Sequence, residues 1–294
     1  MKVLILGGSG MLGHKLWQAC AARFDSYATV RGAPREYEKF GIFDTGHLIG
    51  PVRAEYATSL ESSFAQVSPD VVVNCIGIVK QHPAANDPVA SITVNSLFPH
   101  HAARFARESG ARFIHISTDC VFSGHKGNYS EDDIPDSTDL YGRSKLLGET
   151  SDDNCLTIRT SMIGRELRGC RGLLEWFLTC RGENVRGFTR AFFSGMTTQT
   201  LSAIILRLIV DHPKLNGLWH VASTPISKFD LLTLVKQTYG LAIELRRDET
   251  FVCDRSLDGQ RFRDATGITI PSWPEMLEQM RADDTPYERP RRNS

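Results

Sequence analysis

The chain has 294 residues, enough for one large domain or for one domain with a smaller appended lobe. Its 34 Lys and Arg residues equal its 34 Asp and Glu residues, so no overall charge favours nucleic acid or an anionic membrane. Seven cysteines without a Cys-x-x-Cys pair are typical of reduced thiols, and the apolar N-terminus is too short for a signal peptide or a membrane span. We therefore expect a cytoplasmic protein that binds neither nucleic acid nor a membrane.

The first 160 residues alternate short apolar runs with helical stretches. This alternation predicts an α/β domain of the Rossmann type, with a doubly wound parallel sheet. Apolar runs without polar interruption are expected where helices cover both faces of a parallel strand. The expected strands are 2–6, 26–30, 71–75, 113–117 and 156–159, and the expected helices are 12–24, 60–66, 94–109 and 141–149.

The pattern is looser after residue 160. We interpret residues 161–281 as mainly a smaller C-terminal substrate lobe, and the sequence leaves open that some of its segments return to the sheet. The tail 282–294 is charged, contains proline and is expected to be flexible. Within the lobe, helices are expected at 173–180, 198–210, 228–239 and 274–280, and a short strand at 219–221.

A glycine-rich segment, GGSGMLG at residues 7–13, lies between the first expected strand and the first expected helix. Glycines permit a tight turn and let the backbone approach a pyrophosphate, and the free N–H groups of the following helix favour an anion. This context predicts a dinucleotide site in residues 1–160. The expected contacts are Gly7, Ser9, Gly10, Met11, Leu12 and Gly13.

The residues after the second expected strand distinguish NAD from NADP. An NAD site has a carboxylate there for the ribose 2′-hydroxyl, whereas this chain has Arg31 after Val30. A guanidinium pairs with a 2′-phosphate through forked, charged hydrogen bonds. Arg31 therefore favours NADPH. The alternative is that Arg31 is a solvated residue of a loop without a role in binding.

Tyr141 and Lys145 have the Tyr-x-x-x-Lys spacing at the start of an expected helix. Residues four apart lie on one helical face, so we expect the ammonium to lower the pKa of the phenol and make Tyr141 a proton donor. Ser117, Thr118 and Asp119 follow an expected strand, at the edge where α/β folds bind ligands. We expect Thr118 to hydrogen-bond the substrate oxygen, with Asp119 as the next candidate donor.

Together these segments resemble the extended short-chain dehydrogenase/reductase family, and more narrowly its dTDP-4-dehydrorhamnose reductase group. The most specific are STDCVFSG at 117–124 and YGRSKLLGE at 141–149, supported by VVVNCIG at 71–77, VNSLFPH at 94–100 and DRSLDGQRF at 254–262. The resemblance implies NADPH-dependent reduction of a nucleotide-linked 4-keto-6-deoxy sugar in polysaccharide biosynthesis. Tyr141 would be the acid, Lys145 would hold the nicotinamide ribose, and Thr118 with Ser117 would orient the keto oxygen.

The resemblance also implies roles for other positions. Asn95 would support the active-site helix, and the nucleotide sugar would bind in the C-terminal lobe. Cys120 departs from the pattern, because many relatives have Tyr there. The residues implied at the dinucleotide are Asn74, Cys75, Ile76 and Gly77, and those expected at the substrate are Lys80, Cys120, Val121, Phe122 and Arg190.

Three alternatives stay open at this point. The chain could be a nucleotide-sugar epimerase, or a dehydratase, although Cys120 stands where dehydratases have a second carboxylate. It also resembles NADP-binding regulatory subunits such as the methionine adenosyltransferase β subunit. A homodimer is left open, and no metal is expected because His100 and His101 lack companion ligands.

Overall fold

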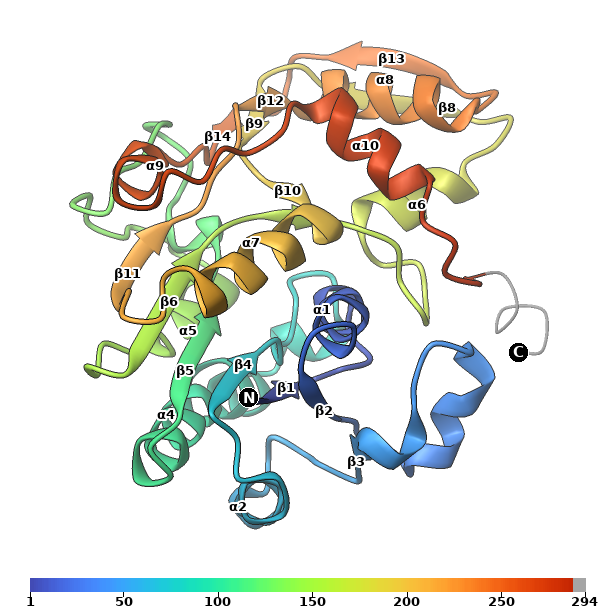
Figure 1. Ribbon diagram of the computed structural model, residues 1–294. Helices are drawn as coiled ribbons and strands as arrows, with labels where there is room; N and C mark the ends of the chain where they lie inside the picture. Colours follow the sequence, from blue (N-terminus) through green and yellow to red (C-terminus); the bar gives the residue numbers. More distant parts are fainter. Residues whose placement is uncertain (288–294) are drawn as a thin grey trace.

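A seven-stranded parallel sheet forms the centre of the computed structural model, which describes residues 1–287 (Figure 1). Its strand order is β11-β6-β5-β4-β1-β2-β3, and every neighbouring pair is parallel. The order reverses beside β1, which is the arrangement of a doubly wound dinucleotide fold. The strands are β1 (Lys2–Leu6), β2 (Asp25–Thr29), β3 (Leu48–Ile49), β4 (Val71–Asn74), β5 (Arg112–Ile116), β6 (Cys155–Arg159) and β11 (Gly217–His220).

Helices cover both faces of this sheet. Helices α1 (Met11–Ala21) and α7 (Thr198–Val210) pack together on one face, and α2 (Ala57–Val67) packs against α4 (Phe98–Glu108) on the other. The helix that carries Tyr141, α5 (Leu140–Leu147), lies on the α4 side. The remaining elements of this part are η1 (Pro34–Phe40), η2 (Thr45–His47), η3 (Pro83–Asn86), α3 (Pro88–Ser91), the π-helical η4 (Ile92–Leu97) and η5 (Asp119–Val121).

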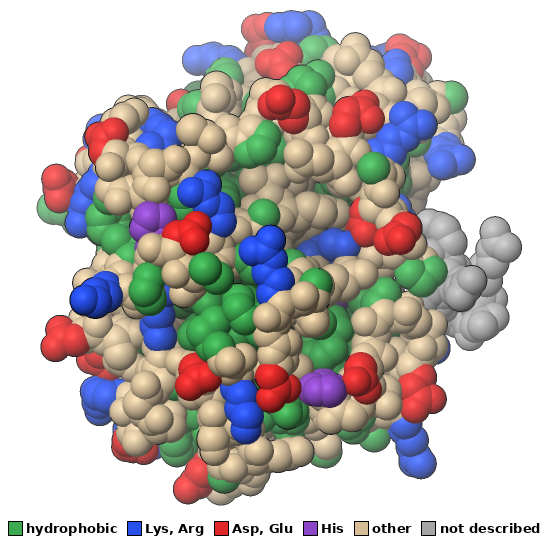
Figure 2. All heavy atoms as spheres, viewed as in Figure 1, with side chains coloured by type: hydrophobic (Ala, Val, Ile, Leu, Met, Phe, Trp, Pro, Cys, Tyr) green, Lys and Arg blue, Asp and Glu red, His purple; other side chains and the backbone are tan. Residues whose placement is uncertain are grey.

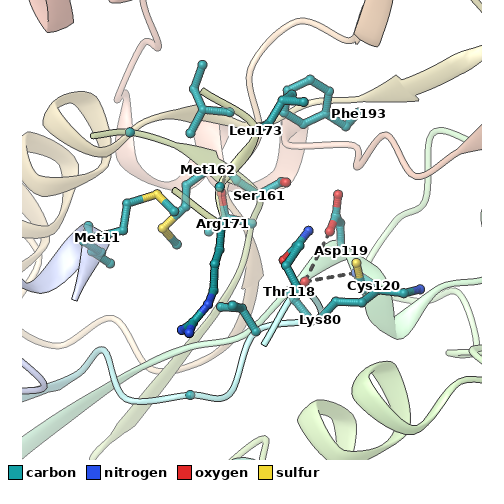
Figure 3. Close-up of a pocket in the computed structure, with 18 of the residues that line it drawn as sticks. Met11, Lys80, Thr118, Asp119, Cys120, Ser161, Met162, Arg171, Leu173 and Phe193 are labelled. Atoms are coloured by element: carbon teal, nitrogen blue, oxygen red, sulfur yellow. Dashed lines mark hydrogen bonds between the residues drawn. The ribbon is translucent and has the colours of Figure 1, made fainter. Parts of the chain in front are cut away.

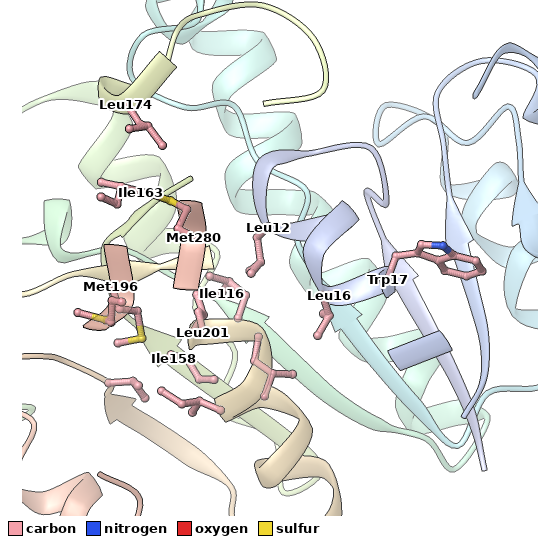
Figure 4. Close-up of a cluster of buried hydrophobic side chains, with 14 of the residues drawn as sticks. Leu12, Leu16, Trp17, Ile116, Ile158, Ile163, Leu174, Met196, Leu201 and Met280 are labelled. Atoms are coloured by element: carbon pink, nitrogen blue, oxygen red, sulfur yellow. The ribbon is translucent and has the colours of Figure 1, made fainter. Parts of the chain in front are cut away.

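The pleat of β1 shows why its sequence is apolar throughout. Val3 and Ile5 are buried in the same cluster as Leu12 of α1, whereas Leu4 and Leu6 are buried with Phe64 of α2. Both faces therefore exclude water, as parallel strands between two helical layers require. Figure 4 shows the first cluster, where α1 meets β5, β6 and α7. The predicted fold class is confirmed.

Two elements from beyond residue 160 belong to the seven-stranded sheet and the helices that cover it. Strand β11 pairs with β6 and extends the sheet, and α7 covers the face next to α1. The short strand expected at 219–221 is therefore present as Gly217–His220, and it returns to the sheet.

The other C-terminal elements form a lobe with small sheets, drawn in the upper part of Figure 1. Strand β9 pairs with β12 and β14, β8 with β13, and β7 with β10. The elements are β7 (Met162–Ile163), α6 (Leu173–Thr179), β8 (Asn184–Phe188), β9 (Ala191–Phe193), β10 (Met196–Thr197), β12 (Ile226–Ser227), α8 (Lys228–Tyr239), β13 (Glu244–Asp248), β14 (Cys253–Asp254), α9 (Gln260–Thr266) and α10 (Trp273–Arg281).

Two local structures differ from the sequence-based expectations. The helix expected at 94–109 begins earlier, at Pro88, and has π geometry through Ile92–Leu97 before α4. Residues 282–287 are packed rather than loose, because Thr285 and Tyr287 are buried and Asp283 is paired with Lys15. The rest of the expected flexible tail, 288–294, lies outside the described residues.

Acidic and basic side chains are interspersed on the face in Figure 2. Between residues 1 and 287, no helix has the length and apolar character needed to cross a bilayer. Over the same residues, no three His, Cys, Asp or Glu side chains gather where they could hold a metal ion.

Candidate active site

A cavity of about 690 Å³ lies where the carboxyl ends of the strands face the C-terminal lobe. The glycine loop forms one wall, and Thr118, Tyr141 and Lys145 form another. In the close-up of Figure 3, Met11 and Thr118 lie on opposite sides, and Leu173 and Phe193 of the lobe lie across from Lys80. The cavity thus joins the predicted dinucleotide loop to the predicted catalytic residues.

Three hydrogen bonds fix the catalytic wall, which is the side of the cavity formed by the predicted catalytic residues Thr118, Tyr141 and Lys145. Lys145 Nζ donates to the carbonyl oxygen of Ile116 at 2.8 Å, which ties α5 to the end of β5. The Asp139 carboxylate accepts from the N–H of Gly142 at 2.8 Å and caps α5. The Thr118 hydroxyl accepts from the N–H of Cys120 at 3.1 Å. Helix and strand end are therefore held together independently of any ligand.

The electrostatics of Tyr141 differ from the prediction. Burial raises the pKa of Tyr141 well above its usual value, and Cys120 and Asp119 add to the rise, while a hydrogen bond with Thr118 opposes it. Burial also lowers the pKa of Lys145 to about 8. The expected lowering of the Tyr141 pKa is therefore wrong, because desolvation of the buried phenol is the largest influence on this pKa. The phenol stays protonated at neutral pH, which is the state that a proton donor needs.

The glycine loop has the geometry of a phosphate-binding turn. Gly7 has a φ of +85°, which favours glycine, and a Cβ on Gly13 would collide with the carbonyl oxygen of Gly7. Helix α1 begins at Met11, so its first N–H groups have no intrahelical acceptor and carry its positive dipole end. Ser9, Gly10, Met11 and Leu12 line the cavity, and Gly7 and Gly13 shape the loop beneath. These residues fit a dinucleotide pyrophosphate.

The other residues predicted at the dinucleotide divide into two groups. Cys75, Ile76 and Gly77 line the cavity. Asn74 and Arg31 are not among the lining residues. Asn74 is buried, and its side-chain oxygen accepts from the N–H of Ile76 at 3.0 Å, so it shapes the turn.

Arg31 is exposed and follows β2 by two residues. Its charge, with that of Arg171, lowers the pKa of His82, although burial is the larger cause. Arg171 lines the cavity, so two guanidinium groups act on the same histidine.

Asn95 has the supporting contacts that the resemblance implies. Its side chain accepts from the N–H of Ile78 at 2.8 Å and donates to Ser144 of α5 at 3.2 Å. It therefore joins the loop after β4 to the active-site helix.

Ser117 faces the cavity but its hydroxyl is engaged elsewhere. It donates to the Glu149 carboxylate at 2.7 Å, and Glu149 is paired with Arg159 at 2.8 Å. Ser117 thus links the end of β5 to Glu149, which lies just beyond α5. The Thr118 hydroxyl donates to Asp119 at 3.2 Å and is the hydroxyl that interacts with Tyr141.

The predicted substrate residues are only partly brought together. Lys80 and Cys120 line the cavity, and Lys80 pairs with Asp139 at 2.6 Å. Val121 and Phe122 do not line it, because both are fully buried in a separate cluster where Phe122 stacks on Tyr129 at 4.1 Å. Arg190 is exposed in a turn and is not among the lining residues.

Sequence reasoning missed the cations of the lobe. Lys228, the first residue of α8, lines the cavity with its ammonium 3.5 Å from the centre of the Phe193 ring. Lys228 and Arg255 both oppose the burial that raises the pKa of Asp119. No local motif marks Lys228, and Arg255 lies in the DRSLDGQRF segment without a sign of this role, because only the packing of the lobe brings both side chains to the catalytic wall. The other missed lining cations are Arg168, Arg171 and Arg186.

The comparisons with known proteins agree with this geometry. A family model described as the RmlD substrate binding domain matches residues 1–285. The chain belongs to this family. The resemblance to extended short-chain dehydrogenases/reductases of the dTDP-4-dehydrorhamnose reductase group is thereby confirmed.

The curated relatives include a polysaccharide biosynthesis protein and the beta subunit of methionine adenosyltransferase 2. The spore coat polysaccharide biosynthesis protein SpsK of Bacillus subtilis is 30% identical over 251 residues, covering 82% of this chain and 80% of the relative. The methionine adenosyltransferase 2 subunit beta of Bos taurus is 29% identical over 156 residues, covering 50% of this chain and 41% of the relative. The structure of a hypothetical dTDP-4-dehydrorhamnose reductase from Sulfolobus tokodaii is similar with a TM-score of 0.77 and 27% identity, covering 93% of this chain and 98% of that one.

Proposed function

We propose that the protein is an NADPH-dependent reductase of a nucleotide-linked 4-keto-6-deoxy sugar. The observation that carries the proposal is the convergence of Thr118, Tyr141 and Lys145 with the glycine loop around one cavity. A strand end, a helix and a loop supply these groups, so their meeting is a property of the tertiary structure. The name of the Sulfolobus tokodaii structure supports the same activity.

The residues fit the reduction of a carbonyl group. Bound NADPH would supply hydride to the carbonyl carbon. Tyr141 holds its proton at neutral pH and donates it to the carbonyl oxygen, which becomes a hydroxyl. The Thr118 hydroxyl orients that oxygen, and Lys145 holds the nicotinamide ribose while its hydrogen bond to Ile116 keeps α5 in place.

The cofactor preference rests on charge. Arg31 would meet the 2′-phosphate of NADPH, since the position directly after Val30 holds a guanidinium instead of a carboxylate. The nearby Glu36 carboxylate accepts from the N–H of Ala33 at 3.0 Å. The pyrophosphate would lie against residues 9–12, with Cys75, Ile76 and Gly77 along the dinucleotide.

The substrate end of the cavity suits an anionic sugar nucleotide. Lys228 and Arg255 line it beside the catalytic wall, and Phe192 and Phe251 offer partly exposed rings. Cations neutralise a diphosphate and aromatic faces stack on a base. A spore coat polysaccharide protein among the relatives is consistent with sugar chemistry.

The direct test is NADPH oxidation in the presence of dTDP-, UDP- and GDP-linked 4-keto-6-deoxy sugars, followed at 340 nm. Turnover on one or more of these sugars with formation of the 4-hydroxy product is expected. Absence of turnover on all three nucleotide classes, by a protein that binds NADPH, would contradict the proposal.

A second candidate is an NADP-binding regulatory subunit without turnover. It is favoured by the methionine adenosyltransferase 2 subunit beta relatives, which match half of this chain. Stable co-purification with a second enzyme, and no NADPH oxidation with any keto sugar, would support it. An epimerase would be recognised by a product with inverted stereochemistry that forms without net consumption of NADPH.

A further inference from the structure

A buried chain of polar groups connects the C-terminal segment to the glycine loop. His14 Nδ1 donates to the carbonyl oxygen of Gly10 at 2.8 Å, and His14 Nε2 lies 2.9 Å from the hydroxyl of Tyr287. The same hydroxyl lies 3.0 Å from the Asp283 carboxylate, and its single proton is donated to one of these two acceptors at a time. His14 is 0% exposed and Tyr287 is 3% exposed, so water does not compete for these contacts.

Asp283 is itself held from two helices. Lys15 of α1 donates to one carboxylate oxygen at 2.8 Å, and Gln199 of α7 donates to the other at 3.2 Å. Thr285 binds Gln18 of α1 as well. The segment 283–287 is thus attached to α1 along more than one turn of the helix.

The Gly10 carbonyl determines how the loop presents its amides. A trans peptide is planar, so its C=O and N–H point in opposite directions. The carbonyl oxygen of Gly10 accepts from the backbone N–H of His14 at 3.1 Å as well as from its Nδ1 at 2.8 Å. Both bonds hold the carbonyl along α1, and they therefore fix the N–H of Met11 in the opposite direction. Gly10 and Met11 both line the cavity, where that N–H belongs to the anion-binding end of the helix.

The opposite wall of the cavity is connected to the same segment. The guanidinium of Arg165 lies 4.6 Å from the centre of the Tyr287 ring and pairs with the buried Glu175 at 2.7 Å. The neighbouring residues Ile163, Gly164 and Glu166 line the cavity. Tyr287 therefore contacts His14 on the loop side and Arg165 on the lobe side, each next to residues that line the cavity.

We propose that residues 283–287 are a positioning element of the dinucleotide site, acting through Tyr287 and His14 on the Gly10 carbonyl. This inference rests on the proposed binding of NADPH. It gives a role in cofactor affinity to a segment that touches neither of the proposed reacting groups and that the sequence predicts to be a loose tail.

The test compares two tyrosine variants of the full chain, using NADPH itself as the probe. Tyr287→Phe keeps the ring against Arg165 and removes the hydroxyl between His14 and Asp283. Tyr129→Phe is the matched control, because Tyr129 is also 3% exposed and its hydroxyl accepts from the N–H groups of Gly124 and Lys126 at 3.1 and 3.0 Å, in another cluster. NADPH Kd is measured by fluorescence titration, and Tm is measured alongside.

Both variants are expected to lower Tm, but only Tyr287→Phe is expected to raise the NADPH Kd, by about 5-fold or more, the effect of losing one net hydrogen bond. Asp283→Asn serves as a second variant if Tyr287→Phe does not fold, with the same expected change. An unchanged Kd in these variants, with Tm lowered as in the control, would show that the segment only stabilises the fold. If the unmutated protein does not bind NADPH, the proposed function fails instead.

Discussion

Lys145 is hydrogen-bonded to the carbonyl oxygen of Ile116 at 2.8 Å, so the lysine of the Tyr-x-x-x-Lys pair is tied to the strand end that precedes Thr118. Tyr141 lies one helical turn earlier on α5. One side chain thereby sets the separation between the proposed proton donor and the hydroxyl that orients the substrate. It also keeps an ammonium buried beside the cavity, which makes its charge sensitive to pH.

The first prediction concerns the proton donor. Tyr141→Phe should lower kcat by about 100- to 10,000-fold, the usual effect of losing a positioned general acid. NADPH should still bind with its normal Kd, because the substitution removes only the hydroxyl and keeps the aromatic ring at position 141. A near-normal rate would move the donor to Asp119 or to a bound water.

The second prediction is a pH dependence set by Lys145. Burial lowers the pKa of this lysine to about 8, so its charged form is lost as the pH rises through that value. We expect kcat/KM to be level near pH 7 and to fall above about pH 8, while Tyr141 stays protonated. In Lys145→Arg the charge persists at pH 10, so any residual activity should not show this fall. A level profile from pH 7 to 10 in the unmutated protein would contradict the assignment.

The third prediction concerns the cofactor. Arg31→Ala should remove most of a preference for NADPH over NADH that we expect to be at least about ten-fold, since a charge-assisted hydrogen bond contributes about 1.5–3 kcal/mol. Arg190→Ala is the matched control, because Arg190 is exposed and lies outside the cavity lining. Equal affinities of the unmutated protein for the two dinucleotides would refute the proposed role of Arg31.

The fourth prediction concerns the lobe. Lys228→Met should raise the KM for the nucleotide sugar by about ten-fold or more and leave the NADPH Kd within about two-fold, because the lost charge-assisted contact belongs to the substrate. Lys214→Met, an exposed lysine, is the control and should change neither value. An increase in NADPH Kd equal to that in KM would place Lys228 at the dinucleotide instead.

The fifth prediction separates the reductase from a dehydratase. Burial raises the pKa of the Cys120 thiol to about 12, so it is neutral at pH 7 and cannot act as the base that dehydration needs. Incubation with dTDP-glucose without added NADPH should give no 4-keto-6-deoxy product by mass spectrometry. Catalytic amounts of that product would overturn the reductase proposal and make Asp119 a dehydration acid.

The sequence by itself determined the features that depend on local order. The short β-rich runs of β1, β4, β5 and β6 predict buried parallel strands, and the glycine loop between β1 and α1 predicts the tight turn that has positive φ at Gly7. The spacing of Tyr141 and Lys145 places both on one face of α5. These relationships span a few residues, so helical and strand periodicity suffice to derive them.

Only the tertiary structure decided the features that depend on distant contacts. It placed Val121 and Phe122 in a core and Arg190 outside the lining, and it brought Lys228 to the catalytic wall. It also reversed the expected direction of the Tyr141 pKa, because burial is a property of the packed cavity and not of the Tyr-x-x-x-Lys spacing. In the same way, Tyr287 reaches His14 across 273 positions of sequence, a contact that no local pattern encodes.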